Sequence, residues 1–506
     1  MKSRTQKAFL NMSTSLLAQI ATIVCGLITP RLILTNFGST YNGVTASATQ
    51  FLNMLNILTL GITGATRVAL YKPLAENDNL GVSRLMKASK IYMRKVALCV
   101  VAMATVLCAV YPLIAENDLS WSENAALIAI VSIGSFTKYF FGLNNTLLLQ
   151  AAQSTYISNI GEIFSVVINT ISVAILVNVK ASIYTVKLGS SIIYLIIPLL
   201  ISLYIHKKFS LTNKCEPDNS GINGRKSVAL HSVANMIHDN VDLITLTFFV
   251  SSKMISVYTV YYTVVSRIKT LLRVFTSGME AAFGDMWVKK EYKTLSDSFR
   301  TYEYMMFTLT ALIFSCVGVL LLPFVRVYTI DVTDVNYILP LFAILITIAE
   351  GIHCIRQPYM TLIYATGCYR QTQWVAIAEA TINLVISLTL VSVMGISGVI
   401  VGTLVSNAFC TVMFIWYTSK NILNRALHKV FLRVLWLLGC VGITVFFSNL
   451  ISSYVTFEVA WIGWITQCTI VFGISIISTL IMSILFYGKD FLSLLNFGLR
   501  VIKKEK

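Results

Sequence analysis

Long apolar runs without any charged residue recur along the whole chain and predict its secondary structure. A helix that crosses the hydrocarbon core of a bilayer takes roughly 20 residues, and several runs are at least that long. The clearest are Ala8–Pro30, Val96–Ala115, Tyr304–Val325 and Val459–Tyr487. The run Ala380–Ser419 is about twice that length, so we expect it to fold back between Gly395 and Gly398.

This pattern predicts an all-α integral membrane protein with about fourteen transmembrane helices. The predicted segments are residues 9–34, 43–69, 92–114, 123–149, 153–178, 181–205, 228–250, 255–278, 299–323, 335–362, 374–395, 397–419, 432–451 and 461–487. We expect the first to be a retained helix, because its apolar run is too long for a signal peptide and no small-residue cleavage site follows.

Composition agrees with a membrane protein. The chain is 56% hydrophobic and 12% charged, whereas a soluble domain is about 25% charged. A soluble protein of this composition would lack the polar residues needed to cover its core.

The net charge of +17 has two explanations, a nucleic-acid surface or a membrane orientation signal. Most of the Lys and Arg residues fall in every second predicted loop and in the two termini. The intervening loops contain only Lys180, Lys253 and Arg326. Because cytoplasmic loops are enriched in Lys and Arg, we expect both termini to be cytoplasmic and no nucleic acid to bind.

Charged residues also occur inside the predicted helices, where a charge costs on the order of 3 kcal/mol at the bilayer centre. The cations are Arg31, Arg67, Lys138, Lys187, Arg267, Lys269, Arg273 and Arg356. The carboxylates are Glu162, Asp239, Asp242, Glu350 and Glu379.

Polar residues share a helix face with many of these charges, at the 100° per residue of an α-helix. The clearest stripes are Ser135, Lys138 and Asn145; Thr155, Ser158, Glu162, Ser165 and Asn169; His231, Asn235, His238, Asp239 and Asp242; and Thr347, Glu350, His353 and Gln357. Several helices with one polar face each indicate a water-accessible cavity inside a helix bundle. Since the cations outnumber the carboxylates, an anionic ligand such as a diphosphate is favoured.

Structural explanations compete with this one. Arg67, Lys187, Arg273 and Glu379 lie near segment ends, where long side chains reach the interface. For Lys138, Glu162, Asp239, Asp242 and Glu350, interhelical ion pairs are the main alternative. Arg31 faces away from the polar stripe of its helix, and Arg356 lies to one side of its own. The spacings His238/Asp242 and Glu350/His353 suit a metal, but no third ligand converges, so we expect no metal site.

Several short motifs, in their order and spacing, resemble bacterial polysaccharide flippases, the O-antigen and capsule repeat-unit exporters of the MOP superfamily. This family is related to MATE transporters and lipid II flippases. The motifs are Thr29–Leu34, Phe37-Gly38, Asn42-Gly43, Gln50–Leu52, Leu70–Ala75, Asn240–Asp242, Val257–Tyr261 and Gly395–Thr403.

The resemblance implies two six-helix lobes around a central cavity, followed by two further helices. The boundaries would be an N-terminal lobe 1–205, a cytoplasmic linker 206–227, a C-terminal lobe 228–419, and helices 13–14 with a basic tail in 420–506. The linker contains the turn-rich stretch Asn213–Gly224.

The implied substrate is a polyprenyl-diphosphate-linked oligosaccharide, moved across the bacterial plasma membrane by alternating access. Related lipid II flippases take cavity arginines from helices 1, 2 and 8, which here offer Arg31, Arg67 and Arg267. Lys138 would add to the cationic cavity, while Glu162, Asp239, Asp242, Glu350 and Arg356 would couple transport to an ion or hold helices in register.

No cofactor is expected, H⁺ or Na⁺ is the expected coupling ion, and other polysaccharide-assembly proteins are the expected protein partners. Two other functions stay open. A MATE-like antiporter for cationic drugs would share the architecture, although the surplus of cations argues against it. A membrane glycan polymerase is an enzyme of a different class, and such enzymes usually have a large outward loop that this sequence lacks.

Overall fold

The computed structural model describes residues 4–59, 62–212, 214–218, 240–274, 276–455 and 457–504. Its regular elements within these ranges are all helical. The first ten are α1 (Arg4–Phe37), α2 (Ser39–Asn53), the 3₁₀-helix η1 (Met54–Thr59), α3 (Ile62–Ala75), α4 (Asn79–Ile114), α5 (Trp121–Thr137), the π-helix η2 (Lys138–Gly142), α6 (Leu143–Ala151), α7 (Thr155–Asn178) and α8 (Ile183–Lys208).

A shorter apolar helix, Asn240–Phe249, follows the longest gap in the described residues. The remaining elements are α10 (Ser252–Val274), α11 (Ser277–Val288), α12 (Tyr292–Tyr328), α13 (Pro340–Ala365), α14 (Tyr369–Met394), α15 (Ile396–Asn421), α16 (His428–Tyr454) and α17 (Trp461–Lys504). The expected all-α membrane architecture is confirmed.

Eleven of the described helices are long and apolar enough to cross a membrane, and the bent pair α2–α3 would make twelve. Their outer faces are apolar, as for Leu98 and Leu113 of α4, which are 66% and 78% exposed. Two predicted segments remain. One is represented by Asn240–Phe249, and the other is α10, a 23-residue helix with four basic residues.

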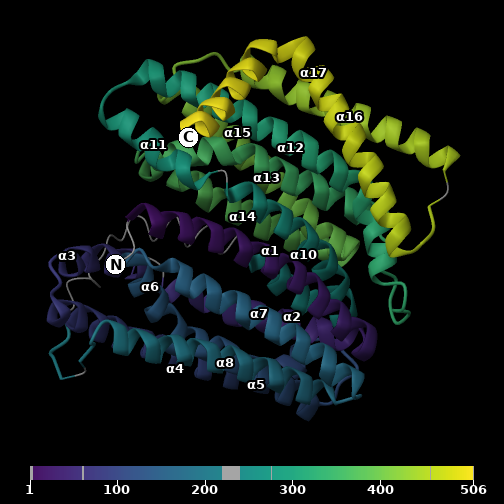
Figure 1. The fold of residues 1–506 in the computed structure, drawn as a ribbon. Coiled ribbons are helices and arrows are strands. Elements are labelled where there is room, and N and C mark those ends of the chain that lie inside the picture. Colours follow the sequence, from purple (N-terminus) through teal and green to yellow (C-terminus); the bar gives the residue numbers. More distant parts are fainter. Residues whose placement is uncertain are drawn as a thin grey trace. The chain divides into compact units, whose positions relative to one another are not determined.

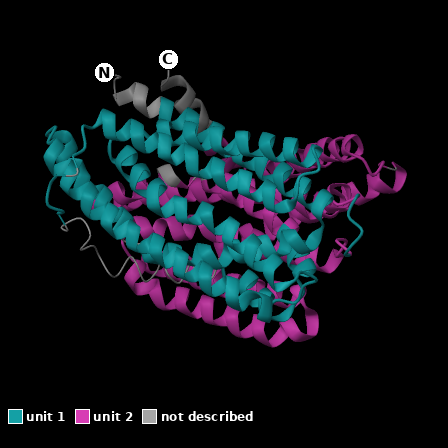
Figure 2. Cartoon of the chain, turned by 90° about the horizontal axis from the view of Figure 1, so that it is seen from below, with its two compact units in different colours: residues 1–259, 331–335 teal, residues 260–330, 336–506 magenta. Residues whose placement is uncertain are grey.

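Contacts between residues divide the chain into two compact units (Figure 2). Unit 1 comprises Met1–Thr259 and Asp331–Val335, and unit 2 comprises Val260–Ile330 and Asn336–Lys506. Residues 213 and 219–227 of the predicted linker 206–227 lie outside the described residues. The predicted lobe boundaries stay a prediction.

In unit 1, neighbouring helices pack along their lengths (Figure 1). The helix α1 lies against α7, α7 against α8, α8 against α5, and α5 against α4. A buried cluster that includes Val100, Tyr111 and Tyr139 fills the space between them. The polar faces predicted on α5 and α7 are therefore held within a single packed bundle.

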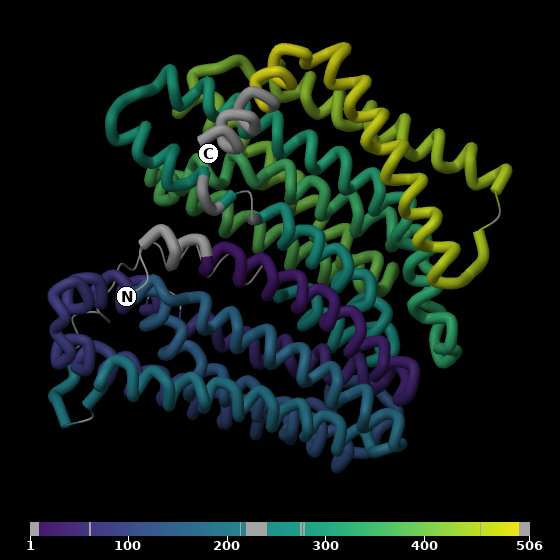
Figure 3. Tube along the Cα trace, in the orientation of Figure 1, coloured from purple at the N-terminus to yellow at the C-terminus, as the bar shows by residue number. Residues whose placement is uncertain are grey.

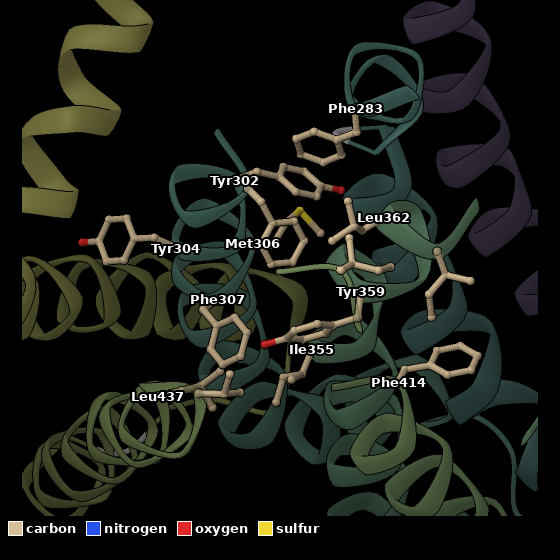
Figure 4. Packing of buried hydrophobic residues seen from close by; sticks show 14 of the residues in the cluster. Phe283, Tyr302, Tyr304, Met306, Phe307, Ile355, Tyr359, Leu362, Phe414 and Leu437 are labelled. Atoms are coloured by element: carbon tan, nitrogen blue, oxygen red, sulfur yellow. The ribbon is translucent and has the colours of Figure 1, made fainter. Parts of the chain in front are cut away.

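In unit 2, α12 is the central helix and contacts α13, α16 and α17. Figure 3 shows the course of these helices along the C-terminal half of the chain. Its core is aromatic. The rings of Phe283 and Tyr302 meet edge to face with centroids 5.6 Å apart, and Phe307 and Tyr359 belong to the same cluster (Figure 4).

The predicted reversal of the long run Ala380–Ser419 is confirmed. The helix α14 ends at Met394 and α15 begins at Ile396, with only Gly395 between them. Gly395 has φ = +55°, a left-handed conformation that glycine adopts without steric cost. The two helices then pack against each other as a hairpin.

Candidate functional site

Unit 1 contains a cavity of about 660 Å³, and polar side chains from several helices line it together with apolar ones. This volume lies in the range of about 300–1,000 Å³ that is usual for ligand pockets. The polar lining residues are Thr29, Thr45, Thr49, Ser135, Lys138, Thr146, Glu162, Asn169, Lys187, Ser190, Ser191 and Tyr194. They come from α1, α2, α5, η2, α6, α7 and α8, so the polar faces of separate helices converge.

Lys138 opens the π-helix η2 and faces this cavity. Its Nζ donates to Oδ1 of Asn56 at 2.9 Å, and Tyr139 Oη donates to the same oxygen at 2.7 Å. Single π-helical turns inside α-helices occur frequently at functional sites. Here the π-turn joins α5 to α6 without a break. The side-chain amide of Asn56 on η1 holds the ammonium group of Lys138 in place.

Glu162 and Lys187 enter the same cavity from α7 and α8. Glu162 accepts a hydrogen bond from Thr22 Oγ1 of α1 at 3.4 Å, and Thr29 and Thr170 hydroxyls join the same two helices at 2.9 Å. Two lysines and one carboxylate therefore share the lining, with hydroxyls and amides between them. Such a lining suits a ligand that has both negative charge and many hydroxyl groups.

Two of the predicted cavity cations of unit 1 do not line this cavity. Arg31 Nη2 lies 3.8 Å from Asp331 Oδ2, which is also in unit 1. Arg67 on α3 is exposed and donates to Gln150 Oε1 at 3.4 Å. Their proposed contact with a diphosphate stays a prediction.

Only one residue of the polar stripe predicted on the seventh helix, Asp242, lies within the described residues. Asp239, with His231, Asn235 and His238, lies outside the described residues. Asp242 is buried and accepts a hydrogen bond from Tyr258 Oη at 3.0 Å. This bond joins the helix Asn240–Phe249 to α10 within unit 1.

In unit 2, four of the charges at membrane depth form two ion pairs. Lys269 Nζ of α10 lies 3.0 Å from Glu350 Oε2 of α13, with both side chains buried. Arg356 of α13 pairs with Glu379 of α14 and also contacts His353 Nδ1 at 2.8 Å.

His353 Nε2 in turn lies 2.9 Å from Gln357 Nε2. The ion pairs join α13 to α10 and to α14. Whether Glu350 and Arg356 couple transport to an ion or hold helices in register stays a prediction. Arg267 is half-buried on α10.

Solved structures are similar to the chain over most of its length. The lipid II flippase MurJ in an inward closed conformation matches with a TM-score of 0.68 and 15% identity, over 94% of this chain and 99% of MurJ. An inward-facing multidrug resistance MATE family transporter of the MOP superfamily matches with a TM-score of 0.63 and 13% identity, over 83% and 99%.

A MOP superfamily transporter from Pyrococcus furiosus matches with a TM-score of 0.55 and 11% identity, over 83% and 97%. This chain has the MOP transporter fold. No protein-family model matches the sequence, and no curated protein matches it either. The expected all-α membrane fold is therefore confirmed, and the relationship to polysaccharide flippases stays a prediction.

Within this MOP fold, sequence reasoning underrated one cavity residue. Lys187 was expected to reach the interface because it lies near the start of a segment. Its helix α8 nevertheless repeats polar or cavity-lining residues at helical spacing, and the members are Lys187, Ser190, Ser191, Tyr194 and Pro198. That stripe was a readable signal in the sequence.

A second omission is an ion cluster centred on Glu303 of α12. Its carboxylate accepts from Arg425, from Arg433 Nη1 at 2.5 Å and from Tyr359 Oη at 2.5 Å. Arg433 also pairs with Asp490 Oδ2 at 2.8 Å. Glu303 and Arg433 lie near the ends of the predicted segments 299–323 and 432–451, and Arg425 and Asp490 lie outside the predicted segments. None of the four is among the charges predicted at membrane depth.

No group of three or more His, Cys, Asp or Glu side chains that could hold a metal is found in the described part of the MOP fold. The sequence offered two residue pairs with the spacing of metal ligands, Glu350/His353 and His238/Asp242. His353 is engaged by Arg356 and Gln357, while His238 lies outside the described residues.

Proposed function

We propose that the protein is a flippase that moves polyprenyl-diphosphate-linked oligosaccharide repeat units from the cytoplasmic to the outer leaflet by alternating access. This step would supply cell-surface polysaccharide biosynthesis, such as O-antigen or capsule, in the bacterial plasma membrane, with both termini cytoplasmic. The observation that supports it most is the cavity of unit 1, in which two lysines, one carboxylate and many hydroxyl groups face one space.

The two lysines suit the diphosphate of such a substrate. Ammonium groups bind phosphate oxygens through charge-assisted hydrogen bonds, which are stronger than neutral ones. The hydroxyl and amide groups between them suit sugar hydroxyls. At about 660 Å³, the cavity accommodates the diphosphate and part of the glycan, and the polyprenyl chain would remain in the bilayer.

The remaining predicted residues take roles that follow from the resemblance. Arg31, Arg67 and Arg267 would contact the diphosphate in other states of the transport cycle, since alternating access changes which side chains face the substrate. Asp239 and Asp242 would hold helices in register, and Glu162 would couple transport to H⁺ or Na⁺. Glu162 is suited to that role because it faces the cavity and has only a hydroxyl as its described partner.

The test replaces Lys138 and Lys187 together by Gln in a strain whose own copy is deleted. Surface polysaccharide and cytoplasmic-leaflet repeat units are measured at matched protein levels. We expect surface glycan to fall at least about tenfold, because the loss of one charged hydrogen bond weakens substrate binding by about that factor. Repeat units should accumulate on the cytoplasmic leaflet. The control variant K95Q/K180Q removes two exposed lysines outside the cavity.

Full export by K138Q/K187Q would overturn the assigned role of the cavity. Arg267→Ala and Arg267→Lys are measured beside it, and full export with both would exclude Arg267 from the mechanism. Deletion alone also separates a flippase from a polymerase, because loss of a polymerase leaves single repeat units on the outer surface.

A MATE-like antiporter for cationic compounds is the second candidate. It is favoured by the carboxylate of Glu162 in the cavity, and carboxylates attract cationic ligands. Drug-resistance assays distinguish the two, because an antiporter would lower sensitivity to cationic dyes and antibiotics and leave surface glycan unchanged on deletion.

A further inference from the structure

A second, smaller pocket lies at the end of unit 1 where α4 begins and α8 ends. Its lining includes Lys87, Lys90, Arg94 and His206, and no carboxylate is among the described residues that line it. Its other polar groups are Ser83, Asn144, Asn145, Ser202 and Thr212. The pocket is therefore strongly biased toward an anion.

The three basic residues of α4 face the same way. They are spaced by three and four residues, which places them on one side of the helix, where like charges repel each other. Among the described residues, no carboxylate forms an ion pair with Lys90 or Arg94. The guanidinium carbon of Arg94 lies 5.2 Å from the centroid of the Phe140 ring, and both residues line the pocket. A bound anion would relieve the repulsion.

A buried amide oxygen without a hydrogen-bond partner indicates a second feature of the ligand. Asn144 lines the pocket, is 7% exposed, and its Oδ1 has no hydrogen-bond partner among the described residues. An unsatisfied buried acceptor costs about 1–3 kcal/mol. A ligand with a hydroxyl next to its anionic group would donate to this oxygen, while the anionic group meets the cations.

The size of the pocket limits what enters it. Its volume is about 90 Å³, the space of about three water molecules at ≈ 30 Å³ each. One phosphate group fits, but an oligosaccharide does not. The pocket is also separate from the large cavity, because Lys138 and Gly142 of η2 line the cavity while Phe140 and Phe141 line the pocket.

We propose that this pocket binds one phosphate group of a phosphate ester that has a neighbouring hydroxyl. The source in a bilayer is an anionic phospholipid such as phosphatidylglycerol, and the soluble source is a small phosphate. Charge counting predicts that this end of unit 1 is cytoplasmic, where anionic headgroups attract basic residues and basic pockets between transmembrane helices bind them.

The test measures binding to the purified full chain in nanodiscs of phosphatidylcholine. One arm adds phosphatidylglycerol and counts retained lipids by native mass spectrometry. The other arm adds inorganic phosphate or glycerol 1-phosphate and follows thermal unfolding. The pocket variant is K90Q/R94Q, and the matched control is R84Q/K95Q, which removes two exposed charges from the same helix outside the pocket.

We expect the wild type and R84Q/K95Q to bind, and K90Q/R94Q to bind at least about tenfold more weakly. A response in the lipid arm or in the soluble arm supports the site and identifies its source. Equal binding by K90Q/R94Q and the wild type, or an equal loss in both variants, overturns the proposal. The single variant R94Q changes an exposed side chain and keeps the test valid if the double variant folds poorly.

Discussion

Lys269 of α10 and Glu350 of α13 form an ion pair inside unit 2, with 3.0 Å between Nζ and Oε2 and side chains that are 8% and 5% exposed. Charges at this depth are costly unless they are paired. The pair therefore fixes the rotation of α10 relative to α13 and removes both groups from the set of free cavity charges.

Replacing one partner of this pair should destabilise the protein more than replacing both partners by apolar residues. Glu350→Gln removes the carboxylate that pairs with the buried Lys269, and we expect a loss of about 3–5 kcal/mol in the free energy of unfolding. The double variant K269M/E350L should recover much of that loss, since well-packed apolar side chains often replace a buried pair without cost. Thermal unfolding in detergent measures both.

The control for this pair is Glu291→Gln, an exposed carboxylate before α12, which should leave unfolding unchanged. If Glu350→Gln were as stable as the wild type, Lys269 would have another compensating group, and the register role of the pair would be wrong.

The Glu303 cluster gives a second prediction. Glu303→Gln removes the charge that faces Arg425 and Arg433, both of which lie largely inside unit 2. We expect a loss of about 3–5 kcal/mol and looser packing of α16 on α12, measured by thermal unfolding and by proteolysis of the segment after α15.

Asp285→Asn is the matched comparison for Glu303→Gln. Asp285 pairs with Lys289 at 2.7 Å on the surface, where both side chains are more than half exposed. Water screens such a pair, so its removal should change little. The carboxylate of Asp285 raises the pKa of Lys289, which lies outside the membrane-spanning helices, so Lys289 stays charged at neutral pH. Equal losses of stability in Glu303→Gln and Asp285→Asn would contradict the stabilising role of the buried Glu303 cluster.

Apolar runs predicted the helices and the hairpin at Gly395, because the length of a run and a flexible residue are local properties. Partners were harder to predict, because they depend on how two helices are rotated against each other. Arg356 lies to one side of the polar stripe on its own helix, and its ion pair with Glu379 of α14 explains that position. Glu303 and Arg433 were missed because charges at the ends of runs are read as interfacial.

A close backbone approach gives a third prediction. A Cβ atom at Gly43 of α2 would lie 1.8 Å from the carbonyl oxygen of Ser252, and Ser252 N is itself held by the carbonyl of Glu116 at 2.9 Å. Backbone cannot move aside as a side chain can, so Gly43→Ala should destabilise by at least about 1–3 kcal/mol. Gly64→Ala, with open space around its Cβ, should be neutral or slightly stabilising.

The last prediction concerns Glu162, which faces the cavity of unit 1 beside Lys138 and Lys187. Glu162→Gln keeps the shape of the side chain and its hydrogen bond from Thr22, but removes the group that could take up and release H⁺ or bind Na⁺. Wild-type transport should respond to an imposed proton or sodium gradient, and the variant should lose that response while it still binds substrate. Membrane vesicles with an imposed gradient, scored for repeat units exposed on the outer leaflet, measure this. Glu116→Gln, in an exposed loop, should respond as the wild type does. An undiminished response in Glu162→Gln would exclude Glu162 as the coupling group.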